Sequence, residues 1–334
     1  MAHGDGIGIA AALSGGGSKG AFQVGVLAEL EDIGVRIDAF AGVSTGAIQA
    51  MAGAMEAVPQ LVADWSSIGR NRDIHFRRLL PIVSKYNSDA LLERIRRFAN
   101  ANGPVKRPLR VGVVSLQSGE FRLIDGLGME PDQLARWVYA SCMVPVEYAP
   151  VERERHVRDT TQWVDGGART VTPLAVAAAF GPRGVLMIRA HPTPTVAYDG
   201  RRFGTILDIG KRAIDVLQSE VSLNDMAGLE LGNAFHAMRE RIESGLASCG
   251  APPDVAEMMR CELDRLADDF GLVRVFPIRP EHEYSATNNY HPIDIAAAIE
   301  AGRRTVDAQR ATILDFVRTC GRTVDRPTPR EKAA

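Results

Sequence analysis

Two strand–glycine turn–helix units follow each other within the first 55 residues, and they constrain the fold more than any other feature. Residues 7–13 form an apolar run of strand length that ends in a glycine-rich segment, and an apolar stripe at helical spacing follows it up to Gly34. A second apolar run, 35–41, leads into Gly-Val-Ser-Thr-Gly at 42–46, and residues 47–55 then have a helical pattern. Such alternation predicts a parallel sheet covered by helices.

The rest of the chain departs from this pattern in two segments. Residues 58–108 have the character of an insertion, with an amphipathic helix that Ser88 is expected to cap, and 205–270 is largely helical. The other expected elements are a hairpin over 109–124, a helix over 131–143, a helix–strand step over 173–190, a strand at 273–278 and a helix over 292–317.

Composition narrows the class of protein. Hydrophobic residues make up 46% and charged residues 24%, as in ordinary globular proteins. With 39 basic and 41 acidic residues the formal charge is −2, which disfavours nucleic acid as a partner. No apolar run approaches the roughly 18 residues of a membrane span, and the N-terminus lacks the pattern of a secretory signal. We therefore expect a cytoplasmic protein.

The four cysteines lie far apart in the sequence. None has a second Cys or a His at the spacing of metal ligands. The sequence predicts neither a metal site nor a disulfide framework, and no motif in it requires a cofactor.

The strongest candidate for chemistry is Ser44, in the segment Gly42-Val-Ser44-Thr-Gly46. A nucleophilic serine needs its hydroxyl held on a sharp strand-to-helix turn, and flanking glycines allow the neighbouring backbones to approach. The helix that follows would favour developing negative charge at its N-terminus. The five-residue pattern alone is also compatible with an ordinary glycine-rich turn.

The first glycine segment has three interpretations. The N–H groups of Gly15, Gly16 and Gly17 can converge into an oxyanion hole, to which Lys19 would add positive charge. Gly15, Gly17 and Gly20 also satisfy the dinucleotide-binding pattern GxGxxG, with Asp38 about twenty residues further on. That alternative predicts an oxidoreductase. A purely structural turn is the third interpretation.

Asp165-Gly166-Gly167 supplies a candidate base, although Asp-Gly is also a common turn. A serine nucleophile usually takes its base from histidine. None of the seven histidines stands in a context that singles it out: His3, His75, His156, His191, His236, His282 and His291.

Taken in order and spacing, these motifs resemble the patatin-like phospholipase family. The resemblance rests on Gly15-x-Gly17-x-Lys19-Gly20, Gly42-x-Ser44-x-Gly46, Asp165-Gly166-Gly167 and the segment Ala-Ser-Cys-Met-Val-Pro at 140–145. It implies a three-layer α/β/α fold with a mostly parallel central sheet. The domain would cover residues 7–310, with helical insertions near 58–108 and 205–270, and residues 311–334 would be the end of a helix and a frayed tail.

The resemblance also implies an activity and a set of roles. The protein would be a carboxylic ester hydrolase acting on lipids through a Ser–Asp dyad, without a cofactor. Ser44 would be the nucleophile and Asp165 the base, with the amides of Gly15, Gly16 and Gly17 as the oxyanion hole. Supporting positions would be Lys19, Gly20, Gly42, Gly46, Gly166 and Gly167. A lipid-binding module without activity is a second alternative.

A basic segment suggests where such a protein would meet its substrate. Residues 70–110 contain eleven basic and three acidic residues, a net charge of +8 in a chain of −2. Apolar residues at 74–82 are interleaved with the first basic cluster. This mixture predicts peripheral contact with an anionic membrane, and a solvated helical surface with internal ion pairs is the alternative.

Overall fold

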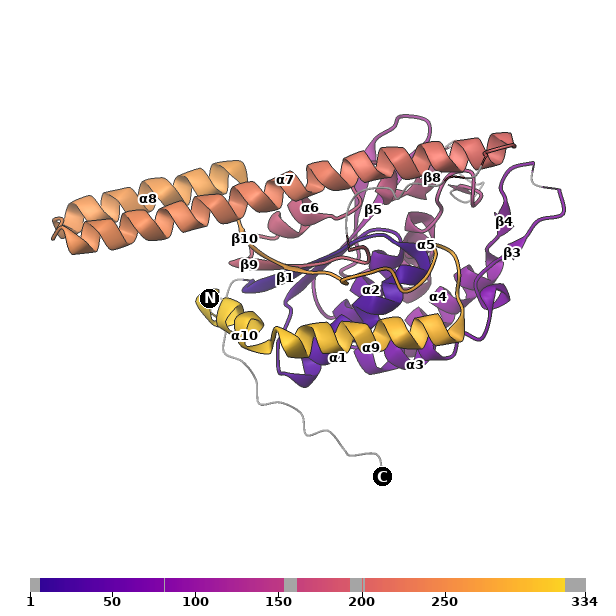
Figure 1. The fold of residues 1–334 in the computed structure, drawn as a ribbon, viewed down its shortest axis with the longest axis horizontal. Helices are drawn as coiled ribbons and strands as arrows, with labels where there is room; N and C mark the ends of the chain where they lie inside the picture. The colour runs from indigo at the N-terminus through magenta and orange to yellow at the C-terminus, as the bar shows by residue number, and fades with distance from the viewer. Residues whose placement is uncertain (1–6, 81, 153–160, 193–199, 201, 322–334) are drawn as a thin grey trace, which may run out of the picture.

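The molecule is built around a mixed β-sheet whose larger part is parallel (Figure 1). The computed structural model describes residues 7–80, 82–152, 161–192, 200 and 202–321. Five neighbouring strands are parallel, in the spatial order β10 (Arg274–Ile278), β9 (Gly184–Ile188), β1 (Ile9–Leu13), β2 (Ala39–Gly42) and β5 (Leu109–Ser115). The parallel sheet predicted from the strand–turn–helix pattern is confirmed.

Three antiparallel strands complete the sheet at β5, the last of the parallel strands. β6 (Phe121–Asp125) forms the expected hairpin with β5, and β8 (Gln162–Asp165) pairs with both β5 and β7 (Val151–Glu152). Along β5, β2 pairs with residues 109–111 and β8 with residues 113–115. Because β6 occupies the opposite edge of β5, β2 and β8 lie end to end, and their carboxyl ends meet beside Gly112.

Helices cover both faces of the sheet, so the fold is the expected three-layer α/β/α arrangement (Figure 1). One layer contains α1 (Ala21–Asp32), α2 (Thr45–Ala54), α3 (Val58–Ser66), α4 (Asp89–Asn102), α5 (Pro131–Ser141), α9 (Pro292–Ala308) and α10 (Arg310–Thr319). The other contains α6 (Leu174–Ala178) and part of α7 (Ile206–Ser248). β1 is buried on both faces, because Ile9, Ala11 and Leu13 face the first layer whereas Ala10 and Ala12 face the second.

The segment 58–108 lies outside the main sheet, and its role as an insertion stays a prediction. It consists of α3, a short hairpin of β3 (Phe76–Arg77) and β4 (Tyr86–Asn87), and α4. Ser88 occupies the N-cap position of α4, but it does not cap the helix. Its hydroxyl is bonded to the hydroxyl of Tyr139 at 2.9 Å instead, so the predicted cap is wrong.

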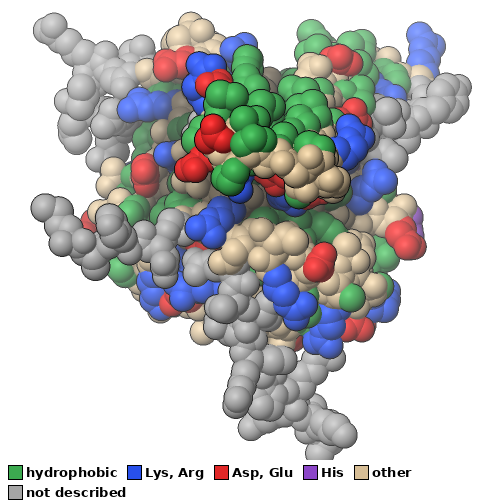
Figure 2. All heavy atoms as spheres, turned by 90° about the vertical axis from the view of Figure 1, so that its left-hand side faces the viewer, with side chains coloured by type: hydrophobic (Ala, Val, Ile, Leu, Met, Phe, Trp, Pro, Cys, Tyr) green, Lys and Arg blue, Asp and Glu red, His purple; other side chains and the backbone are tan. Residues whose placement is uncertain are grey.

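The predicted helical segment 205–270 forms a long hairpin that projects from the body. α7 has 43 residues, a length of about 65 Å at 1.5 Å per residue, and α8 (Pro253–Phe270) returns alongside it. We call the projecting part, residues 238–270, the helical arm. Figure 2 shows this arm end on, with hydrophobic side chains gathered on it.

Two predicted elements differ in extent from the structure. The strand expected at 35–41 begins only at Ala39, because Val35 donates its N–H back to Leu30 at the end of α1. The helix expected over 292–317 is divided at Gln309 into α9 and α10. The predicted frayed tail lies mostly at 322–334, outside the described residues.

All four cysteines are free thiols in the structure. Cys142 and Cys320 are buried, whereas Cys249 and Cys261 are exposed on the helical arm. Within the described ranges, no helix is long and apolar enough to cross a bilayer.

Two glycines allow α1 and α9 to pack backbone against backbone. A Cβ at Gly25 would collide with the carbonyl oxygen of Ile299, and one at Gly302 with that of Phe22. We expect Gly25→Ala to lower the free energy of unfolding by about 2 kcal/mol, despite the better helix propensity of alanine. Gly245→Ala is the matched control, because no neighbour lies within 4 Å of its Cβ position, and it should raise stability by about 0.5–1 kcal/mol. Urea unfolding measures both, and equal effects would contradict the packing argument.

Candidate active site

Ser44 lies on a strained turn between β2 and α2. Its φ and ψ are 55° and −131°, a conformation that a non-glycine residue adopts only when its surroundings hold it there. One such constraint is a hydrogen bond from the Ser44 N–H to the Ser141 hydroxyl at 2.9 Å. Ser141 in turn donates to the carbonyl of Gly112 at 2.7 Å, which ties the turn to β5.

The glycines around Ser44 are required by close backbone contacts. A Cβ at Gly42 would collide with the carbonyl of Gly46, and a Cβ at Gly46 with that of Leu13. The spacing predicted from the sequence thus has a packing reason, since α2 begins directly against the ends of β1 and β2. Ser44 itself is at the N-cap of α2 and is 7% exposed.

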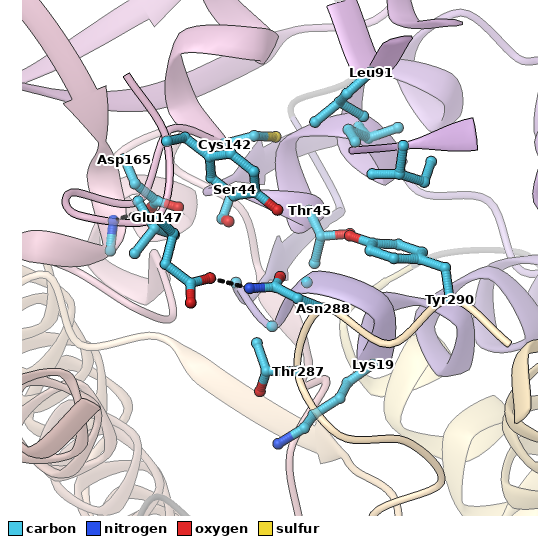
Figure 3. Close-up of a pocket in the computed structure, with 18 of the residues that line it drawn as sticks. Lys19, Ser44, Thr45, Leu91, Cys142, Glu147, Asp165, Thr287, Asn288 and Tyr290 are labelled. Carbon is cyan, nitrogen blue, oxygen red and sulfur yellow. Dashed lines mark hydrogen bonds between the residues drawn. The ribbon is translucent and has the colours of Figure 1, made fainter. Parts of the chain in front are cut away.

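Asp165 is brought to Ser44 by the end-to-end placement of β8 and β2 (Figure 3). It is 1% exposed, and its Oδ1 accepts a hydrogen bond from the Gly167 N–H at 2.6 Å. The next residue has to be glycine, because a Cβ on Gly166 would collide with the carbonyl of Gly112. Asp165-Gly166-Gly167 is therefore both a turn and a means of burying a carboxyl beside Ser44.

The carboxyl of Asp165 is strongly perturbed. Burial raises its pKa from 3.8 to about 7, against the opposing effects of the Ser44 hydroxyl and the Gly167 N–H. Its Oδ2 is buried and accepts no hydrogen bond of standard geometry from a described residue. The Ser44 hydroxyl thus lies close enough to lower the pKa without completing a hydrogen bond to that oxygen. A carboxyl with this pKa can exchange a proton near neutral pH.

The first glycine segment lies against Ser44, but its three amides are not equivalent. The Cβ position of Gly15 is 3.1 Å from the Cβ of Ser44. The Gly15 N–H donates to the carbonyl of Val171 at 3.0 Å, so it is already engaged in this structure, and its place in an oxyanion hole stays a prediction. No described residue accepts a hydrogen bond from the N–H of Gly16 or Gly17, and these two remain candidates.

Lys19 is part of a charge cluster beside this segment. Its Nζ forms a 2.6 Å ion pair with Glu283 and lies 3.4 Å from Nδ1 of His191. Hydrogen bonding from His191 and Lys19 lowers the pKa of Glu283 to about 2. The positive charge expected at Lys19 is therefore balanced by a neighbouring carboxylate.

His191 is a pocket residue that the sequence analysis missed. It follows β9, and its Nε2 lies 3.1 Å from the Cβ position of Gly16. Burial lowers the pKa of His191, which favours the neutral imidazole. Its place directly after a buried parallel strand was a usable signal, because the carboxyl ends of parallel strands meet at one edge.

These residues line a pocket of about 530 Å³ that has two chemically different walls (Figure 3). One wall is apolar and comes from α2, α4 and the loop before α9, with Ile48, Met51, Leu91, Ile95, Phe98 and Tyr290. The other is polar and includes Lys19, His191, Lys211, Asp215, Glu283 and Asn288. The insertion predicted at 58–108 thus supplies much of the apolar wall.

The N-terminal half of α7 borders the polar side of the pocket. Lys211 of this helix forms a 3.3 Å ion pair with Glu147, which is 3% exposed and also accepts a hydrogen bond from Asn288. Asp225 lies further along α7 and accepts the N–H groups of Val171 and Thr172 at 2.8 and 2.7 Å. Because Val171 accepts the Gly15 N–H, α7 is linked through one carboxylate to the glycine segment.

The dinucleotide interpretation does not fit the structure. Asp38 accepts the N–H groups of Gly8 and Ile9, so it lies at the amino end of β1, whereas the glycine segment follows the carboxyl end. The two are separated by the length of the strand, about 16 Å at 3.3 Å per residue. Asp38 therefore does not face a ligand on the glycine segment, as that interpretation requires. Among the described residues, no group of three or more His, Cys, Asp or Glu side chains converges as metal ligands do.

Residues 11–178, half of the chain, match the family model described as patatin-like phospholipase. No curated protein sequence matches the chain.

Two solved structures are similar to the fold. The crystal structure of VipD from Legionella pneumophila matches with a TM-score of 0.39 and 14% sequence identity, covering 92% of this chain and 67% of that one. Human GIVD cytosolic phospholipase A2 matches with a TM-score of 0.46 and 10% identity, covering 93% of this chain and 60% of that one. The chain thus spans 60% of the length of the human protein.

The contact between α7 and the loop after Asp165 is open to measurement. Asp225→Ala removes the carboxylate that accepts two backbone N–H groups. The same substitution removes a negative charge that lies near the buried guanidinium of Arg189. We expect the free energy of unfolding to fall by about 3 kcal/mol, since buried donors and a buried charge lose their partner. Glu220→Ala, at an exposed position of the same helix, should change it by less than about 0.5 kcal/mol. Similar values for the two variants would contradict this role of Asp225.

Proposed function

Because the chain belongs to the patatin-like phospholipase family, we propose that it is a serine acyl hydrolase that cleaves carboxylic ester bonds of lipids. The observation that carries this proposal is the placement of Ser44 beside the buried carboxyl of Asp165, in a pocket with one apolar wall. The hydrolysis of a lipid ester requires these features together: a nucleophile, a base and a surface for the acyl chain.

In the proposed reaction Asp165 takes up one proton and releases it again in each of two steps. The Ser44 Oγ attacks the ester carbonyl carbon while its proton passes to Oδ2 of Asp165. The tetrahedral intermediate then expels the alcohol, which takes this proton and leaves the acyl group on Ser44. A water molecule attacks the acyl carbon and gives its proton to Asp165, and the Ser44 oxygen recovers that proton as the acid departs.

The carboxyl of Asp165 is suited to this role by its burial. A carboxylate with an ordinary pKa near 4 is a weak base for a hydroxyl. Burial raises the pKa of Asp165 to about 7, which brings its proton affinity close to the working pH. Its Oδ2, which accepts no hydrogen bond of standard geometry from a described residue, is the atom that would receive the proton.

We assign the oxyanion contacts to the N–H groups of Gly16 and Gly17. Gly15 has a different role, since its N–H is bonded to Val171 and its missing Cβ lets the segment approach Ser44. Gly17 has a φ of 58°, which favours glycine and turns the backbone at this point. In hydrolases of known mechanism, one oxyanion donor contributes about 3 kcal/mol to the stability of the transition state.

We also propose that the protein works in contact with an anionic membrane through residues 70–110. The formal charge of this segment supports the contact, but ion pairs engage several of its cations. Arg94 pairs with Asp64, Arg96 with Asp132, and Lys106 and Arg107 with Glu56. The electrostatic attraction to the membrane therefore depends on fewer residues than the formal charge of +8 suggests. The cytoplasmic location of the protein stays a prediction.

Active-site labelling tests the role of Ser44. A fluorophosphonate probe should label the parent protein on Ser44, and Ser44→Ala should abolish both labelling and ester hydrolysis. Ser67→Ala is the control, because this hydroxyl lies at the exposed end of α3. Lipid binding without turnover of any ester in the parent would instead favour the alternative of a lipid-binding module.

Asp165→Asn separates the base from the turn residue. The amide still accepts the Gly167 N–H, so a turn role would be preserved, whereas a base role should be lost with a fall in kcat of several orders of magnitude. Activity of the parent should decrease as the pH falls below about 7, where the carboxyl becomes protonated.

The free energy of unfolding should depend on pH in the opposite direction to activity: it should increase as the pH falls. Because the pKa of Asp165 is higher in the folded protein than its ordinary 3.8, the buried charge destabilises the fold increasingly from pH 4 to pH 7. Asp165→Asn should therefore be more stable than the parent at pH 8, by up to about 4 kcal/mol, and this gain should vanish below pH 4. Thermal unfolding of Asp165→Asn and the parent at pH 8 and below pH 4 measures this difference in stability. Full catalytic activity in the same variant would exclude Asp165 as the base.

A further inference from the structure

The loop between β3 and β4 exposes aliphatic side chains that a water-facing loop does not normally carry. Leu79 is 96% exposed, Ile82 88%, Leu80 73% and Val83 68%. We call these four residues the hairpin tip. Single exposed apolar residues are common, but four within five positions form a contiguous patch, and such patches mark contact surfaces.

The base of this hairpin is fixed to the body of the protein. Lys85 and Tyr86 donate their N–H groups to the carbonyls of Val146 and Glu147 at 3.0 and 2.9 Å. The ring of Tyr86 packs on that of His75, with centroids 4.4 Å apart, and His75 is bonded to the Tyr148 hydroxyl at 2.9 Å. The hairpin is thus a supported projection and not a loose connection.

This projection is joined to the rim of the pocket. Glu147, to which β4 is bonded, lines the pocket and pairs with Lys211 of α7. The first turn of α7 also faces this segment, since the Cβ position of Gly210 lies 3.5 Å from Val146. That turn exposes further apolar surface, with Ile206 85% exposed. Figure 1 shows the hairpin and the start of α7 at the end of the molecule to which the parallel strands point.

Charge distinguishes the hairpin from the other exposed apolar surface of the molecule. Residues 76–86 include three basic and no acidic residues. The helical arm also exposes apolar side chains, including Phe270 at 71% and Met258 at 58%, but α8 carries six acidic and two basic residues. The arm projects from the opposite end of the molecule (Figures 1 and 2). An anionic bilayer attracts the first surface and repels the second.

We propose that the hairpin tip inserts into the acyl region of an anionic bilayer, with Arg77, Arg78 and Lys85 at the level of the lipid headgroups. Aliphatic side chains flanked by cations are the composition that favours the interface of such a bilayer. Insertion at this point sets the rim of the pocket, through Val146 and Glu147, against the membrane surface. The purpose of the insertion rests on the proposed hydrolase function, but the insertion itself does not.

A tryptophan at the tip reports insertion directly. The three native tryptophans lie at 65, 137 and 163, within the body of the protein. Leu79→Trp, made in the Ser44→Ala background to exclude turnover, should show blue-shifted emission with vesicles of phosphatidylcholine and phosphatidylglycerol, and quenching by lipids brominated on the acyl chain. Met258→Trp on the helical arm is the matched control and should show neither. An unshifted spectrum for Leu79→Trp, or the same shift for both variants, would overturn the proposal.

Vesicle partitioning separates insertion from surface attraction. In the same background, Leu79→Ser with Ile82→Ser should weaken binding to these vesicles about 100-fold, since each lost aliphatic side chain accounts for about a factor of ten. Met258→Ser with Phe270→Ser should leave binding unchanged. Arg77→Glu should weaken binding on anionic vesicles and not on pure phosphatidylcholine.

The outcomes distinguish this proposal from the proposed function. Binding that depends on Arg77 but not on Leu79 and Ile82 would mean surface attraction without insertion, and would overturn the inference. Because all binding is measured with Ser44→Ala, its result does not depend on whether the parent hydrolyses any ester. Melting temperatures close to that of the parent would show that lost binding is not due to unfolding.

Discussion

The close packing around Gly112 of β5 determines the geometry of the candidate site. Its carbonyl accepts the Ser141 hydroxyl, which holds the Ser44 N–H, and the same carbonyl leaves no room for a Cβ at position 166. β2 and β8 end on either side of this residue. The strained backbone of Ser44 and the buried carboxyl of Asp165 both depend on this arrangement, since neither would persist without the surrounding contacts.

α7 combines three roles that are usually divided among separate elements. Its N-terminal half borders the pocket through Lys211, its middle holds the loop at 171–172 through Asp225, and its C-terminal part belongs to the helical arm. A helix is stiff along its length, because its backbone hydrogen bonds run parallel to its axis. The pocket rim and the loop behind the glycine segment are therefore held in register by one continuous element.

The two ends of the molecule differ in charge as well as in shape. The end with the pocket has the basic hairpin and its aliphatic tip, whereas the helical arm is acidic. Inside the pocket, Glu283 balances the charge of Lys19, and Glu147 balances that of Lys211. The attraction to an anionic surface that we propose would thus come from the exterior of this end, and Lys19 and Lys211 of the pocket would add little to it.

The amino-acid sequence by itself predicted the parallel sheet and the sharp turn at Ser44, because both follow from patterns that are local in the chain: an apolar run, a glycine turn and an amphipathic helix. The pairing of this serine with Asp165 came from the resemblance of several separate motifs to one family, and it stays a proposal. Only the tertiary structure decided that Gly15 donates to Val171, that Glu283 neutralises Lys19, and that His191 lies against Gly16. These contacts join residues more than 150 positions apart, and no local spacing encodes a partner that is reached only when the strand ends are brought together.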